Sequence, residues 1–123
     1  MNLHETSAAL LTARRALNDA ELAHANAIAA EVRASVPGPW VAVPEVGAII
    51  EQGNIEVGVS WGPSGWTVWA AAPGDGWFRG GTPPGVTTPH GAMTWLRGVL
   101  VRCYGANGQA ALRIVVRLLR GWA

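Results

Sequence analysis

One short motif in the sequence has the spacing of a catalytic nucleophile. Residues 58–62 read Gly-Val-Ser-Trp-Gly, which matches the Gly-x-Ser-x-Gly string in which the serine stands on a sharp turn between a strand and a helix. Here a loop and a second extended run follow, and no local signal places a histidine and an acid beside Ser60. We therefore interpret the match as coincidence and expect that the protein is not an enzyme.

The residues that bind metals and cofactors do not form a recognisable pattern. No two of His4, His24 and His90 are at ligand spacing on one helix, and Cys103 is the only cysteine that could complete a set. A single cysteine also excludes a disulfide framework. Residues 80–85 are rich in glycine but lack the lysine and the spacing of a phosphate-binding loop. We expect neither a metal nor another cofactor.

Arginine and tryptophan carry the remaining binding chemistry. If residues 109–121 form a helix, Arg113, Arg117 and Arg120 lie within about 60° of arc on one side of it. Seven tryptophans accompany the arginines, a combination that suits single-stranded nucleic acid and also the centres of protein interfaces. We favour a protein partner. The alternative is a nucleic-acid-binding protein that uses the basic C-terminal half, residues 79–120, together with exposed tryptophan.

The charges are divided unevenly along the chain. Residues 1–75 carry three arginines against eight acidic residues, a net charge of −5, whereas residues 76–123 carry six arginines and no acid, a net charge of +6. This asymmetry indicates an acidic partner or nucleic acid. The alternative is that the basic end packs against the acidic end of the same chain or of a second copy.

The composition indicates one globular domain and the kind of genome that encodes it. A chain of 123 residues has room for a single core, and 50% of its residues are hydrophobic. All nine basic residues are arginine, and alanine and glycine are abundant, which is typical of a GC-rich bacterial or phage genome. We see no secretory signal and no membrane-spanning segment, so we expect a cytoplasmic protein. A phage or mobile-element accessory factor, of the adaptor or inhibitor type, is our hypothesis.

The order of the predicted elements indicates an α+β fold. Residues 1–36 read as one long alanine-rich helix that ends at the Pro-Gly-Pro sequence of residues 37–39. Residues 40–81 read as an antiparallel meander of about four short strands, and residues 88–121 as one or two helices. The last segment, residues 109–121, fits a helix or a strand by its pattern, and its length favours the helix.

Alanines recur along the first helix at alternating steps of four and three residues. We call this set the alanine seam; its members are Ala9, Ala13, Ala16, Ala20, Ala23, Ala27, Ala30 and Ala34. Small side chains in heptad register let two helices approach closely. We expect a leucine face, with Leu10 and Leu17, to cover the sheet and the seam to meet another helix. That helix is the C-terminal one or the same helix of a second copy; we favour the second copy and hence a homodimer.

The alternation of the central strands predicts which aromatic residues are buried. A hairpin closed on the loop at residues 62–65 pairs Trp61 with Trp66 and Gly58 with Trp69, which places Trp61 and Trp66 in the core. Trp69 then lies over Gly58 on the outer face, and Phe78 joins it if its strand pairs next. We expect Trp69 and Phe78 to bind a partner if that face is open; the alternative is that a helix covers it.

Overall fold

Helices from both ends of the chain pack on one antiparallel sheet. The computed structural model describes the backbone of residues 3–71, 78–103 and 106–122, and the side chains of these residues except 3–5, 103, 106 and 107. The elements are α1 (Leu3–Ser35), β1 (Val41–Val43), β2 (Gly47–Gln52), β3 (Ile55–Gly62), β4 (Gly65–Ala71), β5 (Phe78–Gly81), α2 (Pro89–Cys103) and α3 (Ala106–Leu119). The predicted α+β fold is confirmed, with five strands where about four were expected.

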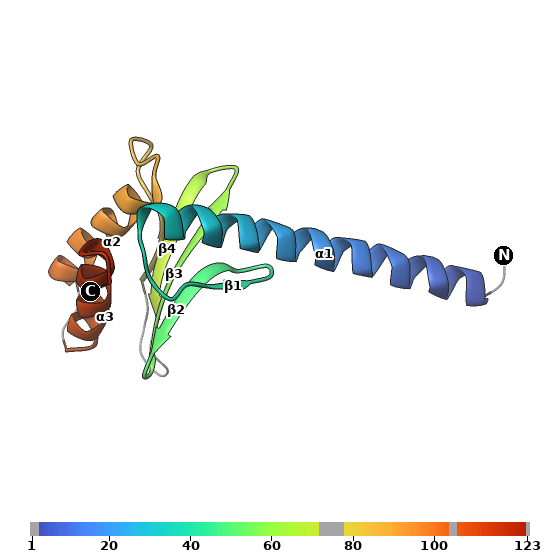
Figure 1. Cartoon of the computed structure of the whole chain (residues 1–123), viewed down its shortest axis with the longest axis horizontal. Coiled ribbons are helices and arrows are strands. Elements are labelled where there is room, and N and C mark those ends of the chain that lie inside the picture. The colour runs from blue at the N-terminus through green and yellow to red at the C-terminus, as the bar shows by residue number, and fades with distance from the viewer. Residues whose placement is uncertain (1–2, 72–77, 104–105, 123) are drawn as a thin grey trace.

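Helix α1 extends far beyond the part of the domain on which it packs (Figure 1). It is rich in alanine, the strongest helix former, and ends just before Pro37 and Pro39, which cannot continue a helix. Its C-terminal half and the residue after it bury Ala25, Ile28, Ala29, Val32 and Val36 against the domain. Residues 6–20, in contrast, have every side chain exposed. We call residues 6–20 the arm.

The sheet is a meander in which each strand is antiparallel to the next, in the order β1-β2-β3-β4-β5. The predicted register of the β3–β4 hairpin is confirmed, because Trp61 pairs with Trp66 and Gly58 pairs with Trp69. Gly65 closes this hairpin with a φ of 97°, a conformation that glycine adopts without strain. The local alternation and the turn residues therefore suffice to set which side chains share a face here.

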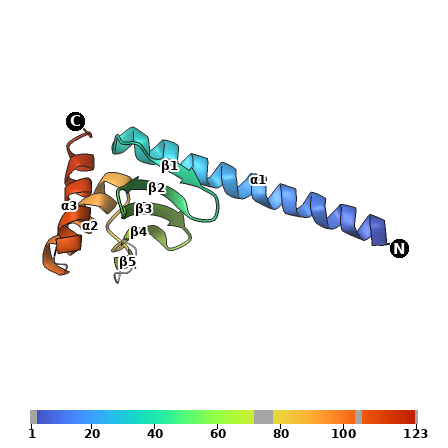
Figure 2. The ribbon, with the colours of Figure 1, turned by 90° about the horizontal axis from the view of Figure 1, so that it is seen from below.

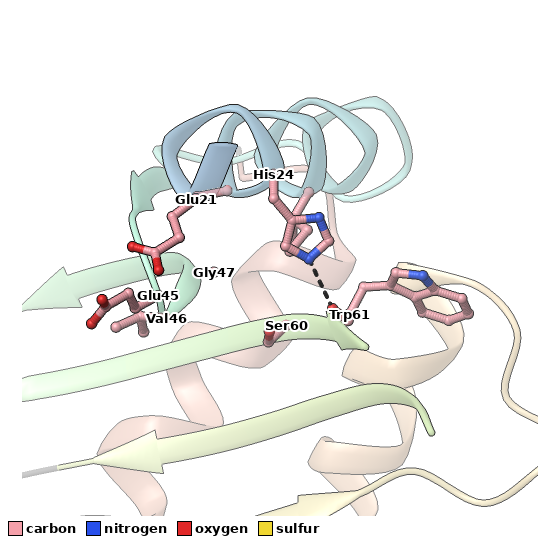
Figure 3. Close-up of a pocket in the computed structure, with 9 residues that line it drawn as sticks. Glu21, His24, Glu45, Val46, Gly47, Ser60 and Trp61 are labelled. Carbon is pink, nitrogen blue, oxygen red and sulfur yellow. Dashed lines mark hydrogen bonds between the residues drawn. The ribbon is translucent and has the colours of Figure 1, made fainter. Parts of the chain in front are cut away.

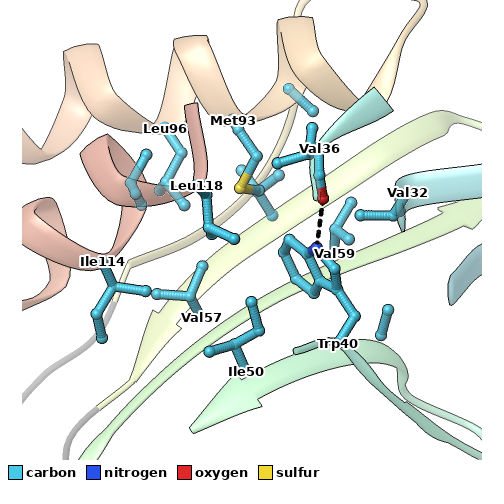
Figure 4. Close-up of a cluster of buried hydrophobic side chains, with 14 of the residues drawn as sticks. Val32, Val36, Trp40, Ile50, Val57, Val59, Met93, Leu96, Ile114 and Leu118 are labelled. Carbon is cyan, nitrogen blue, oxygen red and sulfur yellow. Dashed lines mark hydrogen bonds between the residues drawn. The ribbon is translucent and has the colours of Figure 1, made fainter. Parts of the chain in front are cut away.

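One face of the sheet and all three helices share a single core (Figure 4). The sheet contributes Ala48, Ile50, Val57, Val59, Trp66, Val68 and Ala70. The helices contribute Ile28, Ala29, Val32, Ala92, Met93, Leu96, Leu100, Ala111, Ile114, Val115 and Leu118. The buried Trp40 connects two of these layers, since its Nε1 donates a hydrogen bond of 2.9 Å to the carbonyl oxygen of Val36 at the end of α1. Full burial of each large apolar side chain stabilises the fold by about 1.5–3 kcal/mol.

The two C-terminal helices form a pair that packs on the sheet through α2 against β4 and α3 against β3. Helix α2 begins as predicted, with Pro89 as its first residue and the backbone N–H of Gly91 donating to the Thr88 hydroxyl oxygen at 3.0 Å. The last segment is a helix, as favoured. Figure 2 shows α2 and α3 at the end of the molecule opposite the start of the arm. Across the described ranges, no helix has the length and apolar character that a membrane crossing requires.

Candidate functional site

Ser60 lacks the strand–turn–helix context that its motif needs. It lies in β3, where it pairs with Thr67, and β3 continues through a hairpin into β4. Nε2 of His24 lies 3.1 Å from the carbonyl oxygen of Trp61, so this nitrogen donates to the main chain and does not serve the serine as a base. The interpretation of residues 58–62 as a chance match agrees with this geometry.

A cavity of about 240 Å³ lies between α1 and the turn that joins β1 to β2 (Figure 3). Glu21 from the helix and Glu45 from the turn face each other at its edge. Desolvation raises the pKa of the Glu21 carboxyl, and the negative charge of Glu45 and a hydrogen bond between the two carboxyl groups raise this pKa further. The fold therefore favours the protonated form of Glu21. No pattern in the sequence pointed to this contact, because only the fold brings the turn to the helix.

Metal-ligating residues do not gather within the described part of the chain. Where side chains are described, no group of three or more His, Cys, Asp or Glu residues is placed to hold a metal ion. His24 contacts a backbone carbonyl and His90 is exposed at the start of α2. The side chains of His4 and Cys103 lie outside the described residues.

The outer face of the sheet is closed at Trp69. Its indole lies over Gly58, as predicted, and its Nε1 donates a hydrogen bond of 2.7 Å to Oε2 of Glu56. The guanidinium of Arg79 lies 5.5 Å from the centre of the ring. Only 7% of Trp69 remains exposed, so it presents little aromatic surface to a partner.

The expectation that Phe78 shares the outer face with Trp69 is wrong. In the observed register Arg79 pairs with Trp69, and Phe78 pairs with Ala70, whose side chain points into the core. Phe78 therefore packs on the inner face against Trp95 of α2, with ring centres 5.5 Å apart. The physical reason is that the packing of Phe78 on α2 sets the register of β5 against β4.

The expectation that Trp61 belongs to the core is also wrong. Trp61 is 45% exposed, although its ring packs on the buried Trp66 with centres 4.8 Å apart. It lies at the end of β3 next to the hairpin loop, where His24 of α1 contacts its carbonyl oxygen and leaves much of its ring exposed. Trp66 has no described hydrogen-bond partner for its buried Nε1.

The alanine seam lies on the face of α1 that points away from the sheet. Its direction is about 145° around the helix from the mean direction of Ala25, Ile28 and Val32, which face the domain. All eight seam alanines are exposed. The seam therefore does not pack on the C-terminal helix of the same chain, one of the two arrangements that the sequence allowed.

The leucines of α1 do not cover the sheet as expected. Leu10 and Leu17 are 55% and 58% exposed, because the arm has no sheet beneath it. Ile28, further along the same helix, is buried. Helical periodicity assigns residues to faces of the helix, but it does not show where along the helix the contact with the sheet ends.

The arginines of α3 line one groove. Arg113, Arg117 and Arg120 are exposed and surround a groove of about 500 Å³ whose other lining residues are Leu112 and Val116. We call these five residues the arginine surface. No carboxylate of the described residues lies within 4.0 Å of these guanidinium groups. The acidic residues whose side chains the structure describes therefore form no ion pair with these arginines.

The ring of Trp122 packs against Arg117, the central arginine of this surface. Its ring centre lies 4.1 Å from Cζ of Arg117, and its backbone N–H donates to the Arg117 carbonyl oxygen at 2.8 Å. Gly121 and Trp122 both have positive φ angles, 84° and 61°, which turn the chain back over the helix. Gly121, two residues after the end of α3, was the sequence signal for this turn, and it was missed.

The predicted partner-binding residues do not form one surface. Trp69 lies on the outer face of the sheet, whereas α3 packs on the inner face and presents its arginines to the solvent. The sheet separates the two groups. Neither protein-family models nor curated proteins nor solved structures yielded a match to this chain.

Proposed function

We propose that this protein is a non-enzymatic interaction module that forms a homodimer through α1 and binds a macromolecular partner through the arginine surface. The proposed homodimer is supported by the exposure of the arm, in which every side chain of residues 6–20 is exposed. An isolated helix of this length is marginal in water. A second helix packed along the alanine seam would cover the first half of the seam, which lies in the arm, and this favours association.

The spacing of the alanine seam supports a second copy as the partner of α1. If two copies of α1 run antiparallel about a point between residues 21 and 22, every seam alanine lies opposite another. Ala9 then faces Ala34 of the second copy, and Ala20 faces Ala23 of the second copy. Contacts between alanines allow helix axes to approach to about 8 Å, and antiparallel helices also oppose their dipoles favourably.

The position of the domain leaves room for this pairing. Because the sheet packs on the side of α1 opposite the seam, two helices that meet along their seams keep both domains on the outer sides. Each arm would then run along the back of the other copy's packed half-helix. Contact over the whole length of α1 is needed to approach the roughly 800 Å² per partner of a standard interface.

The mass in solution of Ala20→Glu and of a matched control tests the dimer. Wild type is expected as a dimer and Ala20→Glu as a monomer, because the substitution would bury an unpaired charge at the centre of the seam. Asn18→Glu adds the same charge to the arm away from the seam and should remain dimeric. A dimeric Ala20→Glu, or a monomeric wild type at micromolar concentration, would contradict the proposal.

A further inference from the structure

We infer that the arginine surface binds an acidic amphipathic helix of a partner protein. This inference rests on the proposed partner-binding role of α3 and is independent of the dimer. Arg113, Arg117 and Arg120 follow one another at the i, i+4 and i+7 spacing of a single helix face. Acidic residues at the same spacing on a second helix would lie opposite all three.

The charge of this surface is available to a partner. No described carboxylate pairs with the three arginines, although the chain carries eight acidic residues. Arg117 is also held in place, since its guanidinium lies over the ring of Trp122. An arginine that is already ordered loses less side-chain entropy when it pairs with a carboxylate, which strengthens the contact.

The floor of the groove is apolar and favours a protein helix over a simple anion. Leu112 and Val116 are half-buried beside the arginines, and both contribute to the lining of the groove. A partner helix that places an apolar residue between its acidic residues would cover this floor and bury additional apolar area. A free phosphate or a carboxylate alone would leave the floor in contact with water.

Nucleic acid fits the same surface less well. Residues 113 to 120 span only about 10.5 Å along the helix, whereas proteins that bind duplex DNA by charge neutralise about 6–10 phosphates. Single-stranded binding relies on open aromatic faces on which bases stack. The aromatic ring at this site, that of Trp122, is half-buried and already has the guanidinium of Arg117 on it.

A designed peptide serves as the probe. It is a fluorescein-labelled, capped helical peptide of about 18 residues, long enough to be helical in isolation, with Glu at i, i+4 and i+7 and Leu at i+3. Binding to the full chain is measured by fluorescence anisotropy, beside single- and double-stranded DNA oligonucleotides at the same salt. We expect the peptide to bind more tightly than either oligonucleotide, and a version with Ser in place of Leu to bind more weakly.

Substitutions in the chain locate the contact. The double variant Arg113→Gln/Arg120→Gln is expected to weaken peptide binding by about tenfold or more, because two charge-assisted hydrogen bonds are lost. Arg97→Gln, which removes an exposed arginine of α2, should change the affinity by less than about twofold. Ala20→Glu should keep the peptide affinity of the wild type. A failure of the peptide to bind is therefore distinguishable from a failure of the chain to dimerise.

Three results would overturn the inference. The first is equal weakening by Arg97→Gln and by the double variant, which would indicate unspecific attraction. The second is that an oligonucleotide binds more tightly than the peptide and that the double variant abolishes this binding. The arginine surface would then bind nucleic acid and not an acidic helix. The third is no binding of the peptide at low salt.

Discussion

The indole of Trp69 lies so close to the backbone of Gly58 that a Cβ atom on residue 58 would lie 2.0 Å from the ring carbons. Only glycine leaves room for a ring in this position. The close approach buries Trp69 on a face of the sheet that no helix of the core covers, and Glu56 accepts the hydrogen bond of its Nε1. The ring of Trp69 thus covers the backbone of Gly58 on the outer face and is itself largely buried.

Gly58→Ala is therefore expected to destabilise the fold by about 1–3 kcal/mol, the usual cost of an overpacked site. The ring of Trp69 would have to leave the backbone and lose its hydrogen bond to Glu56. Urea midpoints measure the effect. Gly62→Ala is the control, because a Cβ there meets no atom within 4 Å, and it should change stability by less than about 0.5 kcal/mol. Equal midpoints for the two variants would show that Trp69 moves aside without cost.

The carboxyl pair of Glu21 and Glu45 predicts a pH dependence of stability. Because the folded state raises the pKa of Glu21 above its ordinary value of 4.5, the folded state holds the proton more tightly than the unfolded chain. The resulting stabilisation is fully present below pH 4.5 and is lost as the pH rises through the folded pKa. Glu21→Gln, which stays neutral, is expected to lose this dependence.

Urea midpoints between about pH 4 and pH 7 measure this effect. The midpoint of Glu21→Gln relative to wild type should rise as the pH increases. Glu31→Gln provides a matched control, since Glu31 is an exposed residue of the same helix. If Glu31→Gln changes the pH profile as much as Glu21→Gln does, the contact with Glu45 is not the cause.

The proposed antiparallel register predicts a specific disulfide between two copies. With Cys103 replaced by serine, a mixture of Ala9→Cys and Ala34→Cys chains should form the mixed cross-link on mild oxidation, because opposite seam positions bring the Cβ atoms within about 4.5 Å. Mass spectrometry identifies the product. Ala9→Cys alone should stay uncrosslinked. A cross-link between two Ala9→Cys chains would instead indicate parallel helices.

The elements whose bounds depend on neighbouring residues were predictable from the sequence. The first helix ends where Pro37 and Pro39 stand, and α2 begins at Thr88 and Pro89. The register of the β3–β4 hairpin followed from strict alternation on both sides of a short turn. In each case the deciding interactions are steric or hydrogen-bonding ones between residues close along the chain.

The faces of the aromatic residues were only partly predictable. Trp69 over Gly58 followed from the hairpin, but Phe78 was placed on the wrong face because no two-residue turn signal sets the register of its strand against β4. Alternation within a strand gives two sets of side chains, and it does not say which set faces the core. Phe78 took the inner face because Trp95 of α2 packs on it.

The sequence by itself determined the long helix and the meander, and it favoured helix for the last segment. It also set the spacing of the alanine seam and of Arg113, Arg117 and Arg120. Tertiary structure alone decided that the seam is exposed, that the arm has no sheet beneath it, and that Glu21 meets Glu45. The physical reason is the range of the interactions involved. Backbone sterics and periodicity act within a few residues, whereas exposure and desolvation depend on which distant segments the fold brings together.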